Sequence, residues 1–295
     1  MKPCHDGTGE RLAEMRTVGV VGLGKMGRPI AGHLLEMGHR VVGVDLDPQA
    51  GADLEAAGMQ RGAGPDDLVG TDVCLVLVEG RAVARIVLDG GAYRPALKDC
   101  LTLVCSTVEP DLMRTLHAAA DVAGARLLDA PLCRGDHGAR QGDLLALVGG
   151  SGTALRECEG VLQAFCSDVV HVGGPGAGQA AKLVNNMLLW SNIASVVEAL
   201  QLGEALGVRR AAMVEALLPS SARSWVLETW QRPRDLPWAH EDMRMVLEAS
   251  TEAGLSLPLT GLVHELIKGT RARGVLRDGG FQADGWLMPA YEDEA

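Results

Sequence analysis

A glycine-rich turn limits the folds open to this chain more than any other feature of its sequence. An apolar run, TVGVVG at 17–22, predicts a strand that enters the turn, and apolar spacing over 25–37 predicts a helix that leaves it. A second predicted strand, over 40–45, ends with Asp45. A G-x-G-x-x-G turn in this setting is typical of a dinucleotide pyrophosphate site at a helix N-terminus. The residues of this predicted site are Gly22, Leu23, Gly24, Lys25, Met26 and Gly27.

The apolar segments that follow the turn favour alternating strands and helices. Near-continuous apolar runs, such as DVCLVLV at 72–78, are typical of strands buried on both faces of a parallel sheet. The first part of the chain therefore predicts an open, parallel α/β sheet. Further strands are predicted at 101–105, 125–131, 144–150 and 167–174, and further helices are predicted to open at Pro48, to cover 109–123 and to start at about 153.

The character of the chain changes after residue 174. A single helical pattern runs from Gly176 to about Leu206, no run of strand length follows it, and all five tryptophans lie beyond 174. A helix of about 30 residues is about 45 Å long, enough to cross a domain or reach a neighbouring subunit. We predict two domains: residues 16–174 form the sheet domain, and residues 175–290 form an all-helical domain.

The composition of the 295 residues excludes several classes of protein. With 47% hydrophobic and 22% charged residues, the chain can bury a core and is not generally disordered. A net charge of −11 disfavours nonspecific binding to nucleic acid. The chain has no apolar run of about 18 residues, and its first ten residues lack the apolar stretch of a secretory signal. We therefore expect a cytoplasmic protein that does not span a membrane, with Met15 as an alternative start.

The seven cysteines are scattered along the chain and form no C-x-x-C pair. Several of them lie inside apolar runs, which is typical of buried, reduced thiols. Disulfide frameworks belong mainly to short secreted chains. We therefore predict neither disulfides nor a bound metal.

Asp45 is placed to discriminate between the two nicotinamide dinucleotides. A carboxylate at this position accepts hydrogen bonds from the adenosine ribose hydroxyls and repels a 2′-phosphate. Leu46 and Asp47 follow it, so no arginine stands beside it in the sequence. We expect NAD rather than NADP as the cofactor, unless Arg28 or Arg61 reaches a 2′-phosphate from elsewhere. The alternative for Asp45 is a carboxylate that only caps a helix or stabilises a loop.

Four separated segments resemble the β-hydroxyacid dehydrogenases, the family of 3-hydroxyisobutyrate dehydrogenase and tartronate semialdehyde reductase. They are VGVVGLGKMGRPIA near the N-terminus, LVCSTVEP at 103–110, LLDAPLCRGDHGARQGDLLALVGG at 127–150 and GAGQAAKLVNNML at 176–188. The resemblance spans about residues 16–270 and follows the family's order of motifs.

The resemblance carries expectations for fold and activity. It implies an N-terminal Rossmann domain with a doubly wound sheet, like the NAD-binding domain of 6-phosphogluconate dehydrogenase. A long inter-domain helix would join it to an all-helical C-terminal domain. The activity would be hydride transfer between a nicotinamide cofactor and a short β-hydroxy acid or semialdehyde. The family also implies a homodimer or homotetramer.

By the same resemblance, Lys182 is the general acid/base and Asn186 orients the substrate. Residues four apart on a helix share one face, so an ammonium and a carboxamide at this spacing converge on one substrate oxygen. Ser106 and Thr107 are assigned to the nicotinamide end of the cofactor. The alternatives are a surface lysine on an amphipathic helix for Lys182, and helix caps for the two hydroxyls.

The substrate loop departs from the family pattern. Most relatives have Ser-Gly-Gly where this chain has Cys133, Arg134 and Gly135. We assign these three residues to substrate binding and hypothesise that Arg134 clamps an anionic group, such as a second carboxylate, through two parallel hydrogen bonds. The alternative is a solvated arginine that points away from the substrate. A second departure is Glu241, which stands where relatives carry a lysine that reaches towards the cofactor, and we give it no cofactor role.

Two other functions stay open at this point. An imine reductase would share the fold, although imine reductases usually replace the helix lysine that is present here as Lys182. A weakly active or inactive NAD(H)-binding protein is the second alternative, suggested by the departures at Cys133, Arg134 and Glu241.

Overall fold

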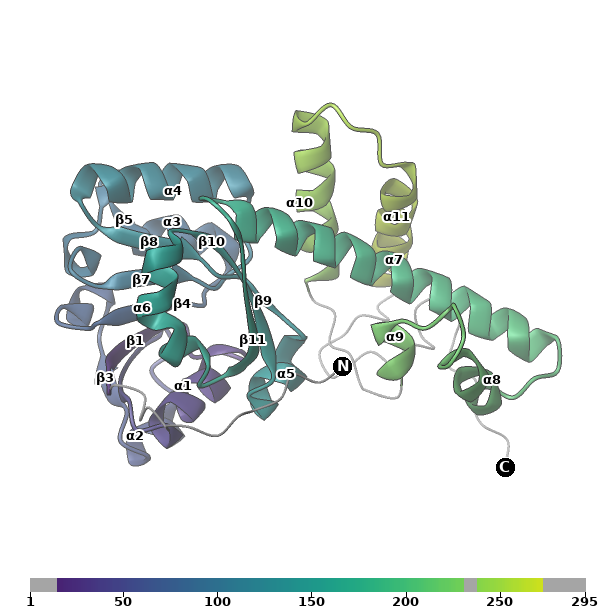
Figure 1. Cartoon of the computed structure of the whole chain (residues 1–295), viewed down its shortest axis with the longest axis horizontal. Helices are drawn as coiled ribbons and strands as arrows, with labels where there is room; N and C mark the ends of the chain where they lie inside the picture. The colour runs from purple at the N-terminus through teal and green to yellow at the C-terminus, as the bar shows by residue number, and fades with distance from the viewer. Residues whose placement is uncertain (1–14, 231–237, 273–295) are drawn as a thin grey trace. The chain divides into compact units, whose positions relative to one another are not determined.

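The computed structural model describes residues 15–230 and 238–272 (Figure 1). Its contacts divide the chain into two compact units, one that ends at Lys182 and one that starts at Leu183. This division lies about two helical turns beyond the predicted one, because the first turns of the long helix bond to the strand ends of the first unit. The domain boundary between 174 and 175 stays a prediction.

The strands are β1 (Thr17–Val21), β2 (Arg40–Val44), β3 (Gln60–Gly62), β4 (Val73–Val76), β5 (Leu88–Asp89), β6 (Ala92–Tyr93), β7 (Leu101–Val104), β8 (Arg126–Asp129), β9 (Leu132–Cys133), β10 (Leu144–Gly150) and β11 (Cys166–Gly173). The α-helices are α1 (Gly27–Glu36), α2 (Ala52–Ala56), α3 (Gly80–Val87), α4 (Pro110–Ala123), α5 (Gly135–Gln141), α6 (Gly152–Leu162), α7 (Ala177–Ala205), α8 (Arg210–Leu217), α9 (Trp225–Glu228), α10 (Ala239–Glu252) and α11 (Pro258–Ala272). Two short 3-10 helices are η1 (Pro65–Leu68) and η2 (Pro95–Leu97).

The first unit is built on one large sheet. Its strand order is β11-β10-β8-β7-β4-β1-β2-β3, with β9 paired to β10. The six strands from β8 to β3 in this order are parallel, and their order is that of the doubly wound dinucleotide-binding folds. The order reverses between β1 and β4, which is where such sheets bind ligands at their carboxyl edge. The predicted α/β architecture is confirmed.

Helices cover both faces of this sheet, and each face has its own apolar core (Figure 1). Ile30 and Leu34 of α1 belong to the core on one face, together with residues of α6. Met113 and Leu116 of α4 belong to the core on the other face, together with residues of α3. Strands covered on both sides must be apolar along their whole length, and this is why their sequences are near-continuous apolar runs.

The sheet is not parallel throughout, and this part of the prediction is wrong. β10 pairs antiparallel with β8, and β11 then pairs parallel with β10. Between β8 and β10 the chain forms β9, which is antiparallel to β10, and the 7-residue helix α5. This connection reverses the chain direction, as antiparallel neighbours require. Parallel neighbours need a longer crossover that returns the chain to the edge of the sheet where the previous strand began.

The helix expected to open at Pro48 starts later. α2 begins at Ala52, after Gly51 in the left-handed conformation with φ 73°. Pro48 lies in the turn that precedes it. The helices expected from 109, from about 153 and over 176–206 are present as α4, α6 and α7.

The second unit contains helices and no strand within residues 183–230 and 238–272. Trp190, Ile193 and Val197 of α7 pack in one apolar cluster with Met243 of α10 and Ile267 of α11. The 29-residue α7 fills the length that its sequence pattern predicts. The predicted domain also includes residues 273–290, with Trp286, which lie outside the described residues.

Six of the seven cysteines lie in the described residues, where they are buried free thiols as predicted. Burial raises the pKa of Cys158 and of Cys166 to about 12. No group of three or more potential metal-binding side chains occurs in the described ranges. None of the helices in those ranges combines the length and apolar character needed to cross a membrane.

Candidate active site

The glycine turn after β1 uses each of its three glycines for a different reason. Gly22 has a φ of 96°, and a Cβ on it would overlap the carbonyl oxygen of Leu77. A Cβ on Gly27 would overlap the carbonyl oxygen of Gly22, so the helix can start beside the strand only with glycine there. A Cβ on Gly24 would meet no atom of the described residues within 4 Å. Gly24 is therefore not required by packing, and the space beside it is open to a ligand.

The other predicted residues of the turn flank this open position. Leu23 is buried in the core on one face of the sheet, and Met26 packs against the same core. Met26 is also the N-cap residue of α1. Lys25 is exposed.

Asp45, which follows β2, holds the turn from the other side. One of its carboxylate oxygens accepts the N–H of Leu23 at 2.6 Å, and the other accepts the N–H of Asp47 at 2.9 Å. The side chain is half-buried. Each carboxylate oxygen has a second lone pair. The loop-stabilising role and a ribose-binding role can therefore be performed by the same side chain.

Both arginines considered for a 2′-phosphate are engaged by acids of the same region. Arg28 donates to the two carboxylate oxygens of Asp53 at 2.9 and 2.8 Å, and this pair raises the pKa of Arg28 and lowers that of Asp53. Arg61 donates to Glu55 and, at 2.6 Å, to the carbonyl oxygen of Ala50. Binding a 2′-phosphate would require one of these arginines to leave its partner.

Ser106 and Thr107 follow β7 at the carboxyl edge of the sheet. The buried Ser106 hydroxyl is 2.7 Å from the carbonyl oxygen of Val78, to which it donates, so it links the ends of β7 and β4. The Thr107 side chain is half-buried, and its hydroxyl forms no hydrogen bond with the described part of the chain. Neither hydroxyl caps α4, because Glu109 occupies the N-cap position without a side-chain bond.

Lys182, in the second turn of α7, directs its amine at the predicted substrate loop. Nζ donates to the carbonyl oxygen of Leu132 at 2.7 Å and lies 3.9 Å from Sγ of Cys133. Cys133 itself is only 4% exposed. The lysine is half-buried rather than extended into solvent. The structure thus brings Lys182 and Cys133 together, although they are far apart in the sequence.

Asn186 lies one turn after Lys182 on α7 and belongs to the second unit. Its side chain is 2% exposed and accepts a hydrogen bond from Nδ2 of Asn185 at 3.0 Å. Its spacing from Lys182 puts the two residues on one face of the helix.

The anion-clamp hypothesis for Arg134 does not agree with the contacts of this side chain. Its guanidinium donates to the carboxylates of Asp143 at 2.9 Å and Asp168 at 2.7 Å. Two carboxylates already compensate its charge, so it does not present an unpaired cation to a substrate. The alternative, an arginine that points away from the substrate, agrees better with these contacts, and its partners include two carboxylates of the protein. The following residue, Gly135, is exposed and also has a positive φ, 64°.

A buried acid that the sequence analysis missed anchors the start of α7. The carboxylate of Asp129, at the end of β8, accepts the N–H groups of Gly176 at 3.0 Å and Gln179 at 3.1 Å. His117 Nε2 lies 3.2 Å from the same carboxylate. A negative charge at a helix N-terminus is stabilised by the unpaired N–H groups there. An acid as the last residue of a buried strand was the signal in the sequence.

Gln179 is a second missed residue, and it connects α7 with the segment after β7. Its Oε1 accepts the N–H of Val108 at 3.0 Å, and its Nε2 donates to the carbonyl oxygen of Ser106 at 2.8 Å. The amide is fully buried and spans Thr107. Gln179 and Lys182 are three residues apart on α7, a spacing that marks one helix face and was visible in the sequence.

Glu241, in the second unit, is paired within its own helix. It accepts hydrogen bonds from Arg244 at 2.6 and 3.0 Å, and these contacts raise the pKa of Arg244. The charge of Glu241 is thus compensated along α10.

The residues of the first unit fit a bound dinucleotide. Gly24 leaves open space at the start of α1, Asp45 offers acceptors at the end of β2, and at the same sheet edge Thr107 offers a hydroxyl that bonds to no group of the described chain. These groups define a dinucleotide-binding α/β domain, and the amine of Lys182 lies at the loop after β8.

Comparisons with known proteins agree with this class. Residues 17–173 match the family model described as the NAD binding domain of 6-phosphogluconate dehydrogenase. Residues 176–283 match the model described as NAD-binding of NADP-dependent 3-hydroxyisobutyrate dehydrogenase.

Individual relatives cover most of the chain. The 2-(hydroxymethyl)glutarate dehydrogenase of Eubacterium barkeri is 32% identical over 88% of this chain and 91% of its own length. The 3-hydroxyisobutyrate dehydrogenase of Pseudomonas aeruginosa is 38% identical over 76% of this chain and 74% of its own. The solved 3-hydroxyisobutyrate dehydrogenase of Mycobacterium tuberculosis with L-serine has a TM-score of 0.80 at 28% identity, covering 92% of this chain and 98% of that one.

The chain belongs to the β-hydroxyacid dehydrogenase family. It is an NAD(P)-dependent oxidoreductase of hydroxy acids, as the resemblance predicted. Solved imine reductases, such as that of Streptomyces aurantiacus with a TM-score of 0.62 at 17% identity, share the fold alone.

Proposed function

We propose that this dehydrogenase uses Lys182 as the general acid/base in the interconversion of a short β-hydroxy acid and its semialdehyde. The observation that carries the proposal is the position of Lys182 Nζ, which donates a hydrogen bond to the loop after β8. Gln179 of the same helix bonds to Ser106 and Val108. One helix thus supports both the amine and the segment expected at the nicotinamide.

The chemistry requires a proton at the substrate oxygen. When bound, a nicotinamide dinucleotide supplies or accepts the hydride. As an aldehyde is reduced, negative charge develops on its oxygen, and the Lys182 ammonium stabilises that charge and delivers the proton. In the oxidation direction the neutral amine accepts the hydroxyl proton. Asn186, at i+4, would orient the same oxygen through its carboxamide.

The loop residues Cys133, Arg134 and Gly135 would contact the rest of the substrate. The carbonyl group of Leu132 already approaches the Lys182 amine, so the backbone that follows it lies beside the proposed reaction centre. The backbone N–H groups of this loop would hold the substrate carboxylate. In this proposal the Arg134 side chain is not a substrate ligand, since its charge is compensated by Asp143 and Asp168.

We propose NAD as the preferred cofactor. Asp45 stands at the end of β2, where its charge would repel a 2′-phosphate. Arg28 and Arg61 are paired with Asp53 and Glu55, so a phosphate would have to compete with these acids.

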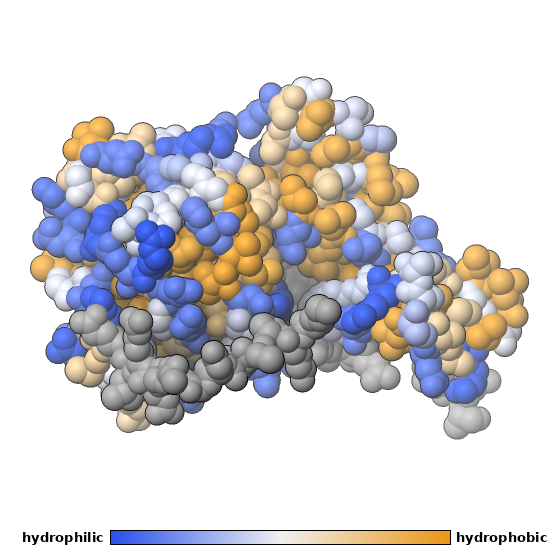
Figure 2. Space-filling model, in the orientation of Figure 1, coloured by the Kyte–Doolittle hydropathy of each residue, from blue (hydrophilic) through white to orange (hydrophobic). Residues whose placement is uncertain are grey.

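We further propose that the chain forms a homodimer or homotetramer through its helical unit. Leu202, Leu206 and Val208 are exposed at the end of α7 and just after it, and no residue of the largely apolar α8 is buried within one chain. Figure 2 shows this apolar surface over the end of α7 and over α8. Contiguous apolar patches of this kind mark protein interfaces, and a second copy of the chain is the partner that the family implies.

The direct test is a substrate screen in both directions, with NAD⁺ and NADP⁺ for the hydroxy acids and with NADH and NADPH for the semialdehydes. By their names, relatives act on 3-hydroxyisobutyrate and 2-(hydroxymethyl)glutarate, so the panel holds these two acids and the matching semialdehydes. We expect turnover of at least one pair, with a larger kcat/KM for NADH than for NADPH. Dinucleotide binding without turnover of any pair would contradict the proposal and favour the alternative of an inactive binding protein.

A further inference from the structure

Arg134 has a backbone conformation that is unusual for its residue type. With φ 81° and ψ 4° it is in the left-handed region, and it is the one non-glycine residue with positive φ in the described ranges. This region is unfavourable for residues other than glycine, because their Cβ approaches the following carbonyl oxygen. A residue held in such a conformation requires contacts that keep it there.

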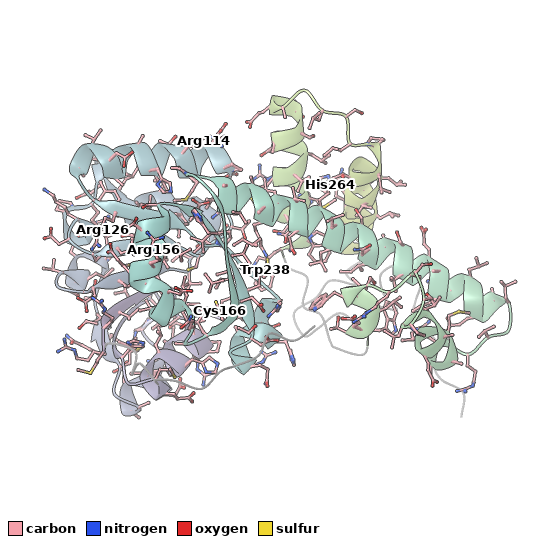
Figure 3. All side chains as sticks on the ribbon, in the orientation of Figure 1. Arg114, Arg126, Arg156, Cys166, Trp238 and His264 are labelled. Carbon is pink, nitrogen blue, oxygen red and sulfur yellow. The ribbon has the colours of Figure 1, made fainter. Side chains whose placement is uncertain are left out.

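The side chain of Arg134 makes those contacts on the side of β11. Nη1 donates to the carbonyl oxygen of Asp143 at 3.1 Å, to its carboxylate at 2.9 Å and to Ser167 Oγ at 2.7 Å. Nη2 donates to the carboxylate of Asp168 at 2.7 Å. Ser167 and Asp168 directly follow Cys166, which Figure 3 labels at the start of β11. Hydrogen bonds from Ser167 and Arg134 lower the pKa of Asp168, so the acid is charged in this cluster.

The backbone on the other side of Arg134 leads directly to the proposed reaction centre. Cys133 is the preceding residue, and its Sγ is 3.9 Å from Nζ of Lys182. The carbonyl oxygen of Leu132 accepts a hydrogen bond from the same amine. The conformation of Arg134 therefore determines how the backbone leaves the site and enters α5.

We propose that Arg134 is a positioning residue, which anchors the substrate loop to the start of β11 through Asp143, Ser167 and Asp168. This inference rests on the proposed function of residues 133–135. Without the anchor, the backbone at 134 is free to leave the left-handed region, and the loop groups beside Lys182 lose their fixed geometry. Substrate binding must then order the loop, which costs additional conformational entropy. KM therefore rises, while the chemistry at Lys182 is unchanged.

Four variants test the proposal: Arg134→Ala, Arg134→Gly, Asp168→Asn and the double variant Arg134→Ala/Asp168→Asn. The substrates are 3-hydroxyisobutyrate, with one carboxylate, and 2-(hydroxymethyl)glutarate, with two. We expect each single variant to raise KM for every substrate that the wild type turns over, by about 5- to 30-fold and by a similar factor for both. kcat and the Kd for NADH stay unchanged, and the double variant adds little because its two residues act through one contact. Arg126→Ala, which removes an exposed arginine paired with Glu157 (Figure 3), is the control and leaves KM unchanged.

Three results would overturn the proposal. Unchanged KM values in Arg134→Ala and Asp168→Asn would show that the anchor has no effect on the site. A rise in KM for the dicarboxylate alone would make Arg134 an anion ligand. A lower dicarboxylate KM in Asp168→Asn, which frees the guanidinium, would also make it a ligand.

Hydrogen exchange separates this inference from the proposed function. Backbone amides over 132–140 should exchange faster in Arg134→Ala and Asp168→Asn than in the wild type, whether or not a substrate is known. Unchanged exchange contradicts the anchor. Absence of turnover in the wild-type screen contradicts the proposed function instead.

Discussion

Single substitutions at two glycines of the turn after β1 should have different effects, one on the stability of the fold and the other on cofactor binding. A Cβ on Gly27 would overlap the carbonyl oxygen of Gly22, whereas a Cβ on Gly24 would have no neighbour within 4 Å among residues 15–230 and 238–272. We expect Gly27→Ala to destabilise the fold by about 1–3 kcal/mol, as overpacking does. Gly24→Ala should keep the wild-type melting temperature but bind NADH more weakly, since its methyl group fills the space left for the pyrophosphate. Thermal unfolding and NADH titration of both variants check this, and a Gly24→Ala variant with unchanged NADH affinity would contradict the assigned pyrophosphate site.

The negative charge of Asp45 should determine the preference for NADH over NADPH. Asp45→Asn keeps a side-chain acceptor for Leu23 but removes the negative charge that disfavours a 2′-phosphate. A hydrogen bond to a charged group contributes about 1.5–3 kcal/mol, so we expect the Kd for NADH to rise roughly tenfold or more. The ratio of kcat/KM for NADH to that for NADPH should fall. Asp72→Asn, an exposed carboxylate that accepts the N–H of Thr17 on the same sheet, should change neither quantity. An unaltered cofactor ratio in Asp45→Asn would remove Asp45 from cofactor selection.

On the scale of one helix, Gln179 should hold α7 in place. Its buried amide bonds the N–H of Val108 and the carbonyl oxygen of Ser106, and Gln179→Met would leave both backbone groups without a partner. Each buried unsatisfied group costs about 1–3 kcal/mol, so the variant should unfold at a lower temperature and show reduced kcat. Gln201→Met, a half-buried position near the far end of α7, is the control and should behave as wild type. Wild-type stability and kcat in Gln179→Met would show that this contact does not position the helix.

The helix pair α10–α11 should make stability depend on pH through His264, labelled in Figure 3. Burial, the neighbouring His240 and Lys268 lower the pKa of His264 below its usual value, and its Nε2 lies 2.9 Å from Nδ1 of His240. Between the lowered folded pKa and the unfolded value of about 6.5, the unfolded chain binds more protons, so stability falls as the pH falls through that window. The melting temperature should therefore decrease below about pH 6.5. His264→Gln should lose part of this decrease, and an identical pH profile in the variant would contradict the assignment.

On the scale of the whole molecule, light scattering should give a mass that is two or four times the 31.0 kDa of one chain. The double variant Leu202→Glu/Leu206→Glu places two charges on the apolar surface at the end of α7 and should shift the mass towards one chain. Val122→Glu replaces another exposed apolar residue, on α4, and should not shift it. A monomeric wild type would contradict the proposed assembly.

Local patterns in the sequence predict much of this fold. The strand, glycine turn and helix around 17–37 are specified by neighbouring residues, and the structure has them as β1 and α1. The direction of β10 was not predictable in this way, because it depends on pairing with β8 and β9 rather than on its own apolar pattern. A strand that is buried on both faces reads the same in either direction.

The same limit applies to the site. Arg134 was visible as a departure in the sequence, but its partners Asp143 and Asp168 lie 9 and 34 residues away and are brought to it by α5 and β11. Gln179 contacts Val108 across 71 residues. The residue types and their helical spacing suggested the chemistry, whereas the contacts that hold these groups in place depend on tertiary structure.

The measurement that tests the central claim most directly compares Lys182→Met with Lys98→Met in one assay of NADH binding and substrate turnover. Lys98 is an exposed lysine of the same unit and serves as the matched control. Loss of a general acid/base costs about 10²- to 10⁴-fold in rate. We predict that Lys182→Met binds NADH as the wild type does and loses turnover by about that factor, while Lys98→Met retains both. Turnover of Lys182→Met at the wild-type rate would contradict the role of this amine in the reaction.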